Sequence, residues 1–246
     1  MKVIMSLLAL LTAISQAPVG KYTEIAGLPP VPEYTVHKAK GKIKVDGQLS
    51  EKAWETAPAV SMLFPWEDQT GAKQPTTFRL LYDQNNLYAG YECEDADITA
   101  TFVNHDDPVY RDDCVEIFLR PDAASDHYFG LEMNVRGVLY DYHYAFPAKH
   151  DKSPDIIGAL LKTSMRGTLN QREDTDQGWT LELAIPWESL RMGAPRKAPR
   201  GGEQMRAQLN RWDGVEPRRR MSNWSNPGMK KPNPHNPERF GVLLFR

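Results

Sequence analysis

Short segments of alternating apolar and polar residues run through most of the chain. Residues 76–83 show this alternation, the turn-forming residues 84–86 follow, and residues 87–94 alternate again. Two such segments around a turn predict a β-hairpin. Because successive side chains of a strand point to opposite faces, the odd-numbered positions from Leu87 to Cys93 should share one face.

The same pattern recurs in further segments, most of them bounded by Gly, Pro, Asn or Asp. These predicted strands are residues 34–39, 114–120, 127–135, 138–144, 160–165, 179–185, 205–211 and 240–245. Only residues 50–54, with Ser50 as the cap, and residues 186–190, with Pro186 at the start, favour helical turns. Many short strands without intervening helices predict an all-β fold, a single β-sandwich over residues 34–246 with one or two short helices.

The N-terminal residues follow another pattern. Lys2 precedes an apolar run and then small residues, an order typical of a secretory signal peptide. We assign residues 1–17 to this signal and the Pro- and Gly-containing residues 18–33 to an extended leader. The protein is therefore expected to be secreted or periplasmic. No apolar run reaches the roughly 18 residues that a membrane-spanning helix needs, so no membrane span is expected.

The charge balance and the cysteine content limit the classes of partner to expect and the possible states of the thiols. Thirty basic and 32 acidic residues give a formal net charge of −2 among 246 residues. This balance gives no electrostatic reason to expect nucleic acid as a partner. Cys93 and Cys114 lie on predicted strands, and export permits a disulfide between them. Buried free thiols are the alternative, since cysteine packs as a small hydrophobe.

The familiar catalytic motifs are absent: there is no glycine-rich phosphate loop, GxSxG or HExxH. His105-Asp106-Asp107 has the composition of a metal-site fragment, but we interpret it as a solvated loop. Glu116, Glu132 and Asp141 fall on predicted strands, and paired carboxylates could hydrolyse glycosides. Glycoside hydrolysis therefore stays an alternative function.

Aromatic and planar polar side chains suggest a saccharide site. They cluster in residues 210–213 and 223–226, and Tyr110 precedes a predicted strand. A sugar ring stacks its C–H face on an aromatic ring, while amides, carboxylates or guanidinium groups bond its hydroxyls. The irregular segments 193–202 and 226–237 are long enough to carry such binding residues on a rigid sandwich.

Five segments in order resemble the motifs of family 9 carbohydrate-binding modules. They are residues 45–54 (VDGQLSEKAW), 78–88 (FRLLYDQNNLY), 112–119 (DDCVEIFL), 178–187 (GWTLELAIPW) and 237–241 (PERFG). The resemblance implies an immunoglobulin-like or jelly-roll β-sandwich that binds an oligo- or polysaccharide without chemistry of its own. Members often accompany polysaccharide-degrading enzymes in secreted bacterial proteins, so a glycoside hydrolase is the implied partner.

The resemblance also implies hydrogen-bonding residues. In characterised modules an acidic residue of the third motif, together with amides late in the chain, bonds the sugar. Glu116 matches the acidic position. Gln208 matches an amide, and Asn210 follows two residues later, on the same face of the strand.

The aromatic clamp of the family is only partly matched. In characterised modules the sugar lies between two tryptophans. Tyr110 takes the place of the first, and the second would fall within residues 233–236, where no tryptophan occurs. His235 or Trp224 is the expected substitute. The family can bind calcium as a structural ion, but no ligand set here matches one, and no other cofactor is expected.

Three alternatives stay open. A haem-binding electron-transfer domain of a related sandwich fold would draw its ligands from Met133, Met221, Met229 and His235. A purely structural module would result if the incomplete clamp binds nothing. The basic run at residues 218–220 would favour acidic sugars if its charges act together.

Overall fold

The computed structural model describes residues 20–145, 149–151, 156, 158–190 and 197–246. The expected signal peptide lies outside these residues and stays a prediction. Within the expected leader, residues 20–32 form neither strand nor helix, but the backbone N–H groups of Glu24 and Ile25 donate to the carbonyl of Gly228 at 2.9 and 3.0 Å. No helix in the described part of the chain is long and apolar enough to cross a membrane.

Strands dominate the described residues. They are β1 (Glu33–Lys38), β2 (Val60–Ser61), β3 (Thr76–Tyr82), β4 (Asn86–Cys93), β5 (Cys114–Arg120), β6 (Tyr128–Asn134), β7 (Leu139–Ala145), β8 (Lys149–Asp151), β9 (Leu160–Arg166), β10 (Gly178–Pro186), β11 (Gln204–Asp213), β12 (Arg220–Asn223) and β13 (Gly241–Phe245). Short 3-10 helices are η1 (Lys52–Thr56), η2 (Val109–Arg111), η3 (Trp187–Ser189) and η4 (Pro237–Arg239).

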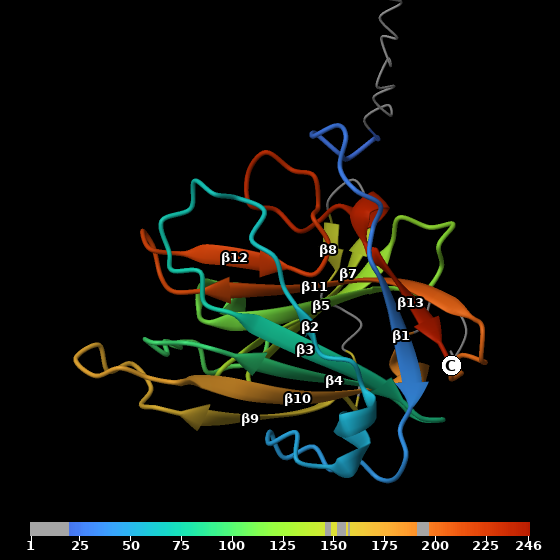
Figure 1. Ribbon diagram of the computed structural model, residues 1–246, viewed down its shortest axis with the longest axis horizontal. Helices are drawn as coiled ribbons and strands as arrows, with labels where there is room; N and C mark the ends of the chain where they lie inside the picture. Colours follow the sequence, from blue (N-terminus) through green and yellow to red (C-terminus); the bar gives the residue numbers. More distant parts are fainter. Residues whose placement is uncertain (1–19, 146–148, 152–155, 157, 191–196) are drawn as a thin grey trace, which may run out of the picture.

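The strands form one hydrogen-bonded path that curls into two layers (Figure 1). Its order is β8-β7-β6-β5-β11-β13-β1-β3-β4-β10-β9, with β12 added on β11 and β2 on β3. The connection between the layers is β1, because its residues 33–36 pair with β13 while His37 and Lys38 pair with β3. The result is the expected all-β sandwich.

The core lies between the two layers. Val115, Ile117 and Leu119 of β5 are fully buried there together with Leu181 and Leu183 of β10. These β5 residues alternate with the other side chains of the strand, which point to the opposite face. The face of β5 that carries Glu116 therefore points away from the core.

The first and fourth family motifs meet at Glu182 of β10. Glu182 is fully buried, and its carboxylate accepts hydrogen bonds from the backbone N–H groups of Asp46 and Gly47 at 2.8 and 2.7 Å and from Trp54 Nε1 at 2.9 Å. Gly47 has a φ of +87°, and a Cβ there would lie 2.7 Å from the Thr163 carbonyl carbon. These two motifs thus serve the fold, because the Glu182 carboxylate attaches the segment before η1 to the outer face of β10.

All ten strands predicted from the sequence are present, with ends that differ by at most two residues. The short strands β2, β8 and β12 were not predicted, since two to four residues carry too little alternation. Both expected helical segments are 3-10 turns. The prediction that Ser50 caps the first is wrong, because Glu51 occupies the N-cap position and its side chain makes no capping hydrogen bond.

Cys93 and Cys114 are buried free thiols. Cys93 faces the core between the layers, whereas Cys114 belongs to a second apolar cluster on the outer face of β5 and β6. Because the two side chains lie in different clusters, the disulfide alternative is not realised. Burial raises the pKa of Cys93 to about 12, which suppresses its thiolate.

Candidate functional site

The outer face of the β5–β6–β7 layer carries a row of polar side chains. Directly paired positions on neighbouring strands make up this row, which consists of Tyr140, Glu132, Glu116, Asn210 and Asn223. None of the five side chains is more than 6% exposed. Side chains directly opposite each other in a sheet are close enough to interact, so the row forms one polar band across five strands.

A pocket of about 340 Å³ lies over this band. It is lined by Tyr110, Glu116, Glu132, Tyr140, Trp212 and the loop residues Pro232, Asn233, Pro234 and His235. Tyr110 belongs to η2, and the loop residues belong to the Pro-rich segment before η4. The volume is at the small end of the range for ligand sites in proteins, so the pocket fits a small ligand or the end of a chain.

Glu116 is held in place at the floor of this pocket. Its Oε2 accepts a hydrogen bond from Asn210 Nδ2 at 3.0 Å, and Asn210 Oδ1 accepts one from Asn223 Nδ2. Burial raises the pKa of Glu116 to about 7, while the hydrogen bond from Asn210 and the nearby charge of Arg219 act in the opposite direction. The carboxyl group therefore changes its protonation state near neutral pH.

Glu132 is fixed from the other side of the band. Its Oε1 accepts a hydrogen bond from the Tyr142 hydroxyl at 2.9 Å. Tyr142 reaches Glu132 across Gly130, where a Cβ would lie 2.3 Å from the Tyr142 ring. The contact therefore requires a glycine at position 130. The hydrogen bond from Tyr142 in turn positions Glu132, the second carboxylate of the pocket.

Aromatic side chains form two walls of the pocket. Tyr110 and Tyr140 meet edge to face, with ring centroids 6.1 Å apart and an interplanar angle of 63°. Trp212 is supplied by β11, and the guanidinium carbon of Arg219 lies 3.9 Å from its ring centroid. Residues 210–213 were noted from the sequence as a cluster of aromatic and polar residues, but Trp212 itself was not chosen. Its position at the end of a strand was the available signal.

His235 reaches the pocket, although its ring is already engaged by protein groups. It stacks on Phe118 with centroids 5.0 Å apart and an angle of 13°, and its Nδ1 lies 2.6 Å from the Tyr128 hydroxyl. The ring is thus part of the apolar cluster on the outer face. It can offer an edge to a ligand, whereas the Phe118 side of the ring is covered.

The structure corrects the expected roles of the two amides. Gln208 is fully buried; its Nε2 donates to the Ser225 carbonyl at 2.7 Å, and its Oε1 accepts from the Ser225 N–H at 3.1 Å. Asn210 is also fully buried, between Glu116 and Asn223. Gln208 therefore holds the loop after β12, and Asn210 positions Glu116, while neither side chain lines the pocket.

The expectation that Trp224 is a stacking platform is also wrong. Trp224 is 4% exposed and packs against Phe78, with ring centroids 5.6 Å apart, and against Tyr34. A Cβ at Gly241 would lie 2.5 Å from its ring. Trp224 is therefore a core residue, and the closing motif at residues 237–241 needs its glycine to accommodate the indole.

The basic run does not form one charged patch. Arg218 is exposed. Arg219 lies on Trp212. Arg220 is 5% exposed and donates to the carbonyls of Trp66 at 2.9 Å and of Gly71. Because Arg218 is exposed, Arg219 lies on Trp212 and Arg220 is buried among backbone carbonyls, the three charges do not form one surface for a ligand.

A buried carboxylate cluster lies beneath another part of the surface. Asp95, Asp113 and Asp213 have oxygens within 4.8 Å of one another, and Arg211 Nη2 donates to Asp95 at 2.9 Å and to Asp213. The oxygens of Asp113 accept from the backbone N–H groups of Thr99 and Gly214. The carboxylate oxygens are thus already engaged by a guanidinium and by backbone N–H donors. A calcium ion needs six to eight free oxygen ligands, so this cluster does not fit one.

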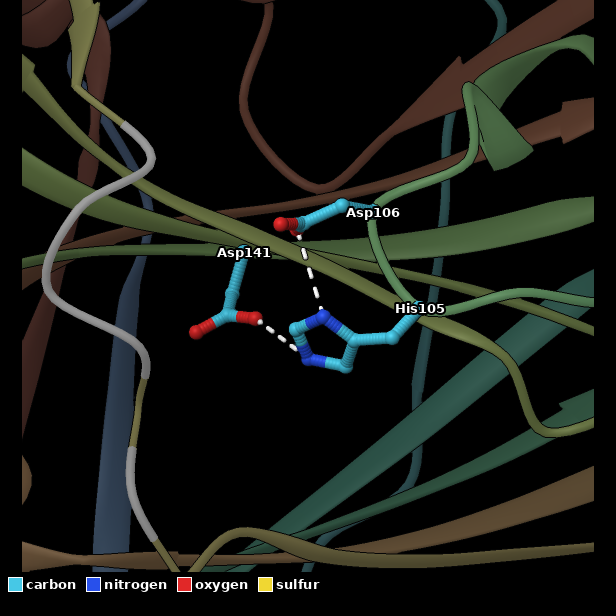
Figure 2. Close-up of side chains that lie close together, drawn as sticks. All are labelled: His105, Asp106 and Asp141. Carbon is cyan, nitrogen blue, oxygen red and sulfur yellow. Dashed lines mark ion pairs between the residues drawn. The ribbon is translucent and has the colours of Figure 1, made fainter.

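His105 links the loop before η2 to β7 (Figure 2). Figure 2 shows its Nδ1 facing Asp106 and its Nε2 facing Asp141. The two nitrogen–oxygen distances are 3.5 and 3.2 Å. Asp107 instead accepts from the backbone N–H of Asn104 at 2.9 Å. The three residues offer ligand atoms that lie within 4.8 Å of one another, and the two ring nitrogens each face a different carboxylate, so the imidazole bridges Asp106 and Asp141.

Met133 and His235, two of the haem ligands considered from the sequence, lie on different sides of the β5–β6–β7 layer. Met133 lies in the core between the layers, on the face of β6 opposite to Glu132 and the pocket. His235 lies on the pocket side. Asp141, considered as a catalytic carboxylate, likewise alternates with Tyr140 and points away from the pocket.

The chain matches a known family and resembles solved structures. The family described as carbohydrate family 9 binding domain-like matches residues 45–246. A protein from Bacteroides uniformis, provisionally described as carbohydrate-binding, has a TM-score of 0.76 and 20% identity, covering 88% of this chain and 100% of that one. No curated protein sequence shows a significant match.

A family 9 carbohydrate-binding module from Caldicellulosiruptor kristjanssonii is also similar. In complex with cellotriose it has a TM-score of 0.60 and 19% identity, with 87% of this chain and 93% of that one covered. In complex with glucose the values are 0.58, 18%, 86% and 95%. At these identities the structural likeness supports the fold.

Proposed function

Because this chain belongs to the carbohydrate family 9 binding domain-like family, we propose that it binds a carbohydrate in the pocket over Glu116 and does not convert it chemically. The observation that carries the proposal is the combination of a buried carboxylate with aromatic walls in one small pocket. A carboxylate accepts hydrogen bonds from sugar hydroxyls, and aromatic faces pack against sugar C–H groups.

The positions of Tyr110 and Glu116 support a way of holding the sugar between a ring at the rim and a carboxylate at the floor. Tyr110 is half-buried at the pocket rim and provides a ring for stacking. Glu116 lies at the floor and is aimed by Asn210, so its carboxylate needs little reorganisation when a ligand binds. Ordering the acceptor in advance reduces the entropy lost on binding.

The first experiment is isothermal titration calorimetry of the purified protein with glucose, galactose, mannose, xylose and cellotriose. A glycan array, run beforehand, identifies further saccharides to titrate. Saturable binding of at least one saccharide supports the proposal. Absence of binding to every sugar on the array contradicts it and favours a purely structural module.

Tyr110→Ala tests the location of the site. Loss of one stacking ring should weaken the bound sugar by about 1–3 kcal/mol, by analogy with stacking of planar rings on aromatic side chains. Leu160→Ala is the matched control, because Leu160 is 62% exposed on β9 and lies outside the pocket. Equal affinities of wild type and Tyr110→Ala would place the sugar elsewhere.

Glycoside hydrolysis is the second candidate, and one observation favours it. Glu116 and Glu132 are directly paired across β5 and β6 and line the same pocket, and side chains so paired lie about as close as the two carboxylates of a retaining glycosidase. Release of reducing sugar from oligosaccharides by the purified protein, lost in Glu116→Gln, would replace the binding proposal. Binding without turnover supports it.

We further propose that the protein is secreted and acts together with a polysaccharide-degrading enzyme. The apolar N-terminal run after Lys2 supports export. A module that binds saccharides without converting them would bring a glycoside hydrolase close to its substrate. Fractionation of cells that express the full chain, followed by N-terminal sequencing of the exported form, tests the first part. A protein retained inside the cell with its N-terminus intact contradicts it.

A further inference from the structure

The loop that closes one side of the pocket is not held by a strand or helix of its own. Residues 226–237 contain four prolines, which have no backbone N–H to donate, and residues 226–236 form neither strand nor helix. Residues 232–235 of this loop are one wall of the pocket. The position of the wall therefore depends on contacts that other segments make with the loop.

The segment before β1 supplies such contacts on the first side of the wall. We call residues 21–29 the N-terminal arm. The backbone N–H groups of Glu24 and Ile25 both donate to the carbonyl of Gly228, and the Glu24 carboxylate accepts from the N–H of Lys230 at 2.9 Å. The arm thus fixes the loop just before the wall begins.

Asn236 connects the arm to the other side of the wall. Its side chain is fully buried, and its Nδ2 donates to Thr23 Oγ1 at 3.1 Å and to the Pro227 carbonyl at 2.6 Å. Its Oδ1 accepts from the N–H of Glu238 in η4 at 3.2 Å. Because Asn236 directly follows the wall, the arm holds the loop at both ends of the four residues that face the pocket.

The arm also packs directly on the loop. A Cβ at Gly228 would lie 2.7 Å from Thr23 Cγ2 and 2.8 Å from Leu28 Cδ1, so the two segments are in van der Waals contact. Further along, Arg239 Nη2 donates to the carbonyl of Pro29 at 2.8 Å. A shift of the arm would therefore leave the loop without packing as well as without hydrogen bonds.

The arm precedes the part of the chain that the family matches, which begins at residue 45. The five family motifs, of which the first spans residues 45–54, therefore do not account for its contacts with the loop. The arm is a feature of this chain that the family assignment leaves unexplained.

We propose that the N-terminal arm positions the pocket wall of residues 232–235, so that the affinity of the site depends on a segment outside the family domain. The inference rests on the proposed function and adds positioning residues to it, namely Thr23 and Glu24, whose side chains hold the two ends of the wall. A ligand that needs the wall in place binds with an apparent affinity reduced by the fraction of time that the wall is elsewhere.

Calorimetry of a Thr23→Val, Glu24→Ala double variant tests the proposal, with whichever of glucose, galactose, mannose, xylose and cellotriose binds the wild type. Both changes remove a hydrogen bond to the loop, and affinity should fall about fivefold, the typical effect of one lost hydrogen bond on an equilibrium. A Thr23→Ser, Glu24→Gln double variant keeps both acceptor oxygens and should retain the wild-type affinity. Glu33→Ala is the matched control, since Glu33 is exposed at the start of β1 and lies outside the arm and the loop.

Hydrogen exchange of backbone amides, measured by mass spectrometry without sugar, separates positioning from a general loss of stability. Residues 228–236 should exchange faster in Thr23→Val, Glu24→Ala than in the wild type, whereas exchange in β5 should not change. Loss of affinity without faster exchange in the loop would contradict positioning by the arm.

The two proposals fail in different ways. Equal affinities of the wild type and Thr23→Val, Glu24→Ala would overturn the inference and leave the proposed function intact. Equal losses in that variant and in Thr23→Ser, Glu24→Gln would do the same, because the second variant keeps the acceptors. Failure of the wild type to bind any of the five sugars contradicts the proposed function and the inference with it.

Discussion

Glu116, Gln208 and Asn210 all point to the outer face of their strands, but only Glu116 lines the pocket. The difference lies in their neighbours. Gln208 is occupied by the backbone of Ser225, and Asn210 is held between Asn223 and Glu116. Amides with both ends satisfied inside the protein serve as supports, whereas a carboxylate with one oxygen directed by an amide keeps acceptor capacity for a ligand.

Glu116 gives a prediction for the pH dependence of binding. Its pKa is raised to about 7 by burial, so the carboxyl is largely protonated at pH 5.5 and largely ionised at pH 8.5. An ionised carboxylate is the stronger acceptor for sugar hydroxyls. Affinity measured by calorimetry should therefore rise as pH increases through 7, and Glu116→Gln should bind more weakly with no such rise. A pH-independent wild type would exclude Glu116 from the contact.

At the scale of elements, the motifs shared with the family divide into structural and ligand-facing groups. Glu182 attaches the segment before η1 to β10. Asp83 closes the turn between β3 and β4, since its Oδ1 accepts from the N–H groups of Asn85 and Asn86 at 2.7 and 2.8 Å. Only Glu116 in the third motif reaches the pocket. Similarity in these motifs therefore reports mainly on the fold.

Glu182→Ala tests the structural role of the first and fourth motifs. The substitution leaves three buried or partly buried donors without their acceptor, and each such loss costs about 1–3 kcal/mol. We expect a marked fall in the free energy of unfolding measured by urea titration. Glu92→Ala on β4 is the control, because its side chain is 46% exposed and exposed ion pairs contribute about 0–1 kcal/mol. Similar stability of the two variants would contradict this role.

For the whole molecule, the buried carboxylates around Arg211 couple stability to pH. Burial raises the pKa of Asp95 to about 6 and raises that of Asp113 well above its ordinary value. A carboxyl with a raised pKa binds its proton more tightly in the folded state, so its contribution to stability is complete below the unfolded pKa near 4 and is lost as pH rises through the folded value.

We therefore expect a higher midpoint of thermal unfolding at pH 5 than at pH 7.5, as measured by calorimetric scanning. Each unit of pKa shift corresponds to about 1.4 kcal/mol, so the effect is large enough to detect. In Asp95→Asn the difference between the two pH values should shrink, because one of the titrating groups is gone. A wild-type midpoint that is lower at pH 5 would contradict the assigned direction.

The period-two pattern along the chain determined the strands, because alternation is a local property of the backbone. It predicted that Leu87, Ala89, Tyr91 and Cys93 share one face, and the structure places all four in the core. The family resemblance named Tyr110 and Glu116, which do share a pocket.

The tertiary structure alone decided which residues share the pocket and which are buried beneath it. Trp224 and Trp212 look alike in sequence, each beside an asparagine or arginine at a strand end, yet Trp224 packs on Phe78 and Trp212 lines the pocket. Likewise, nothing local distinguishes Arg218, Arg219 and Arg220. Burial and pairing depend on chain segments that are distant in sequence, and only folding brings those segments together.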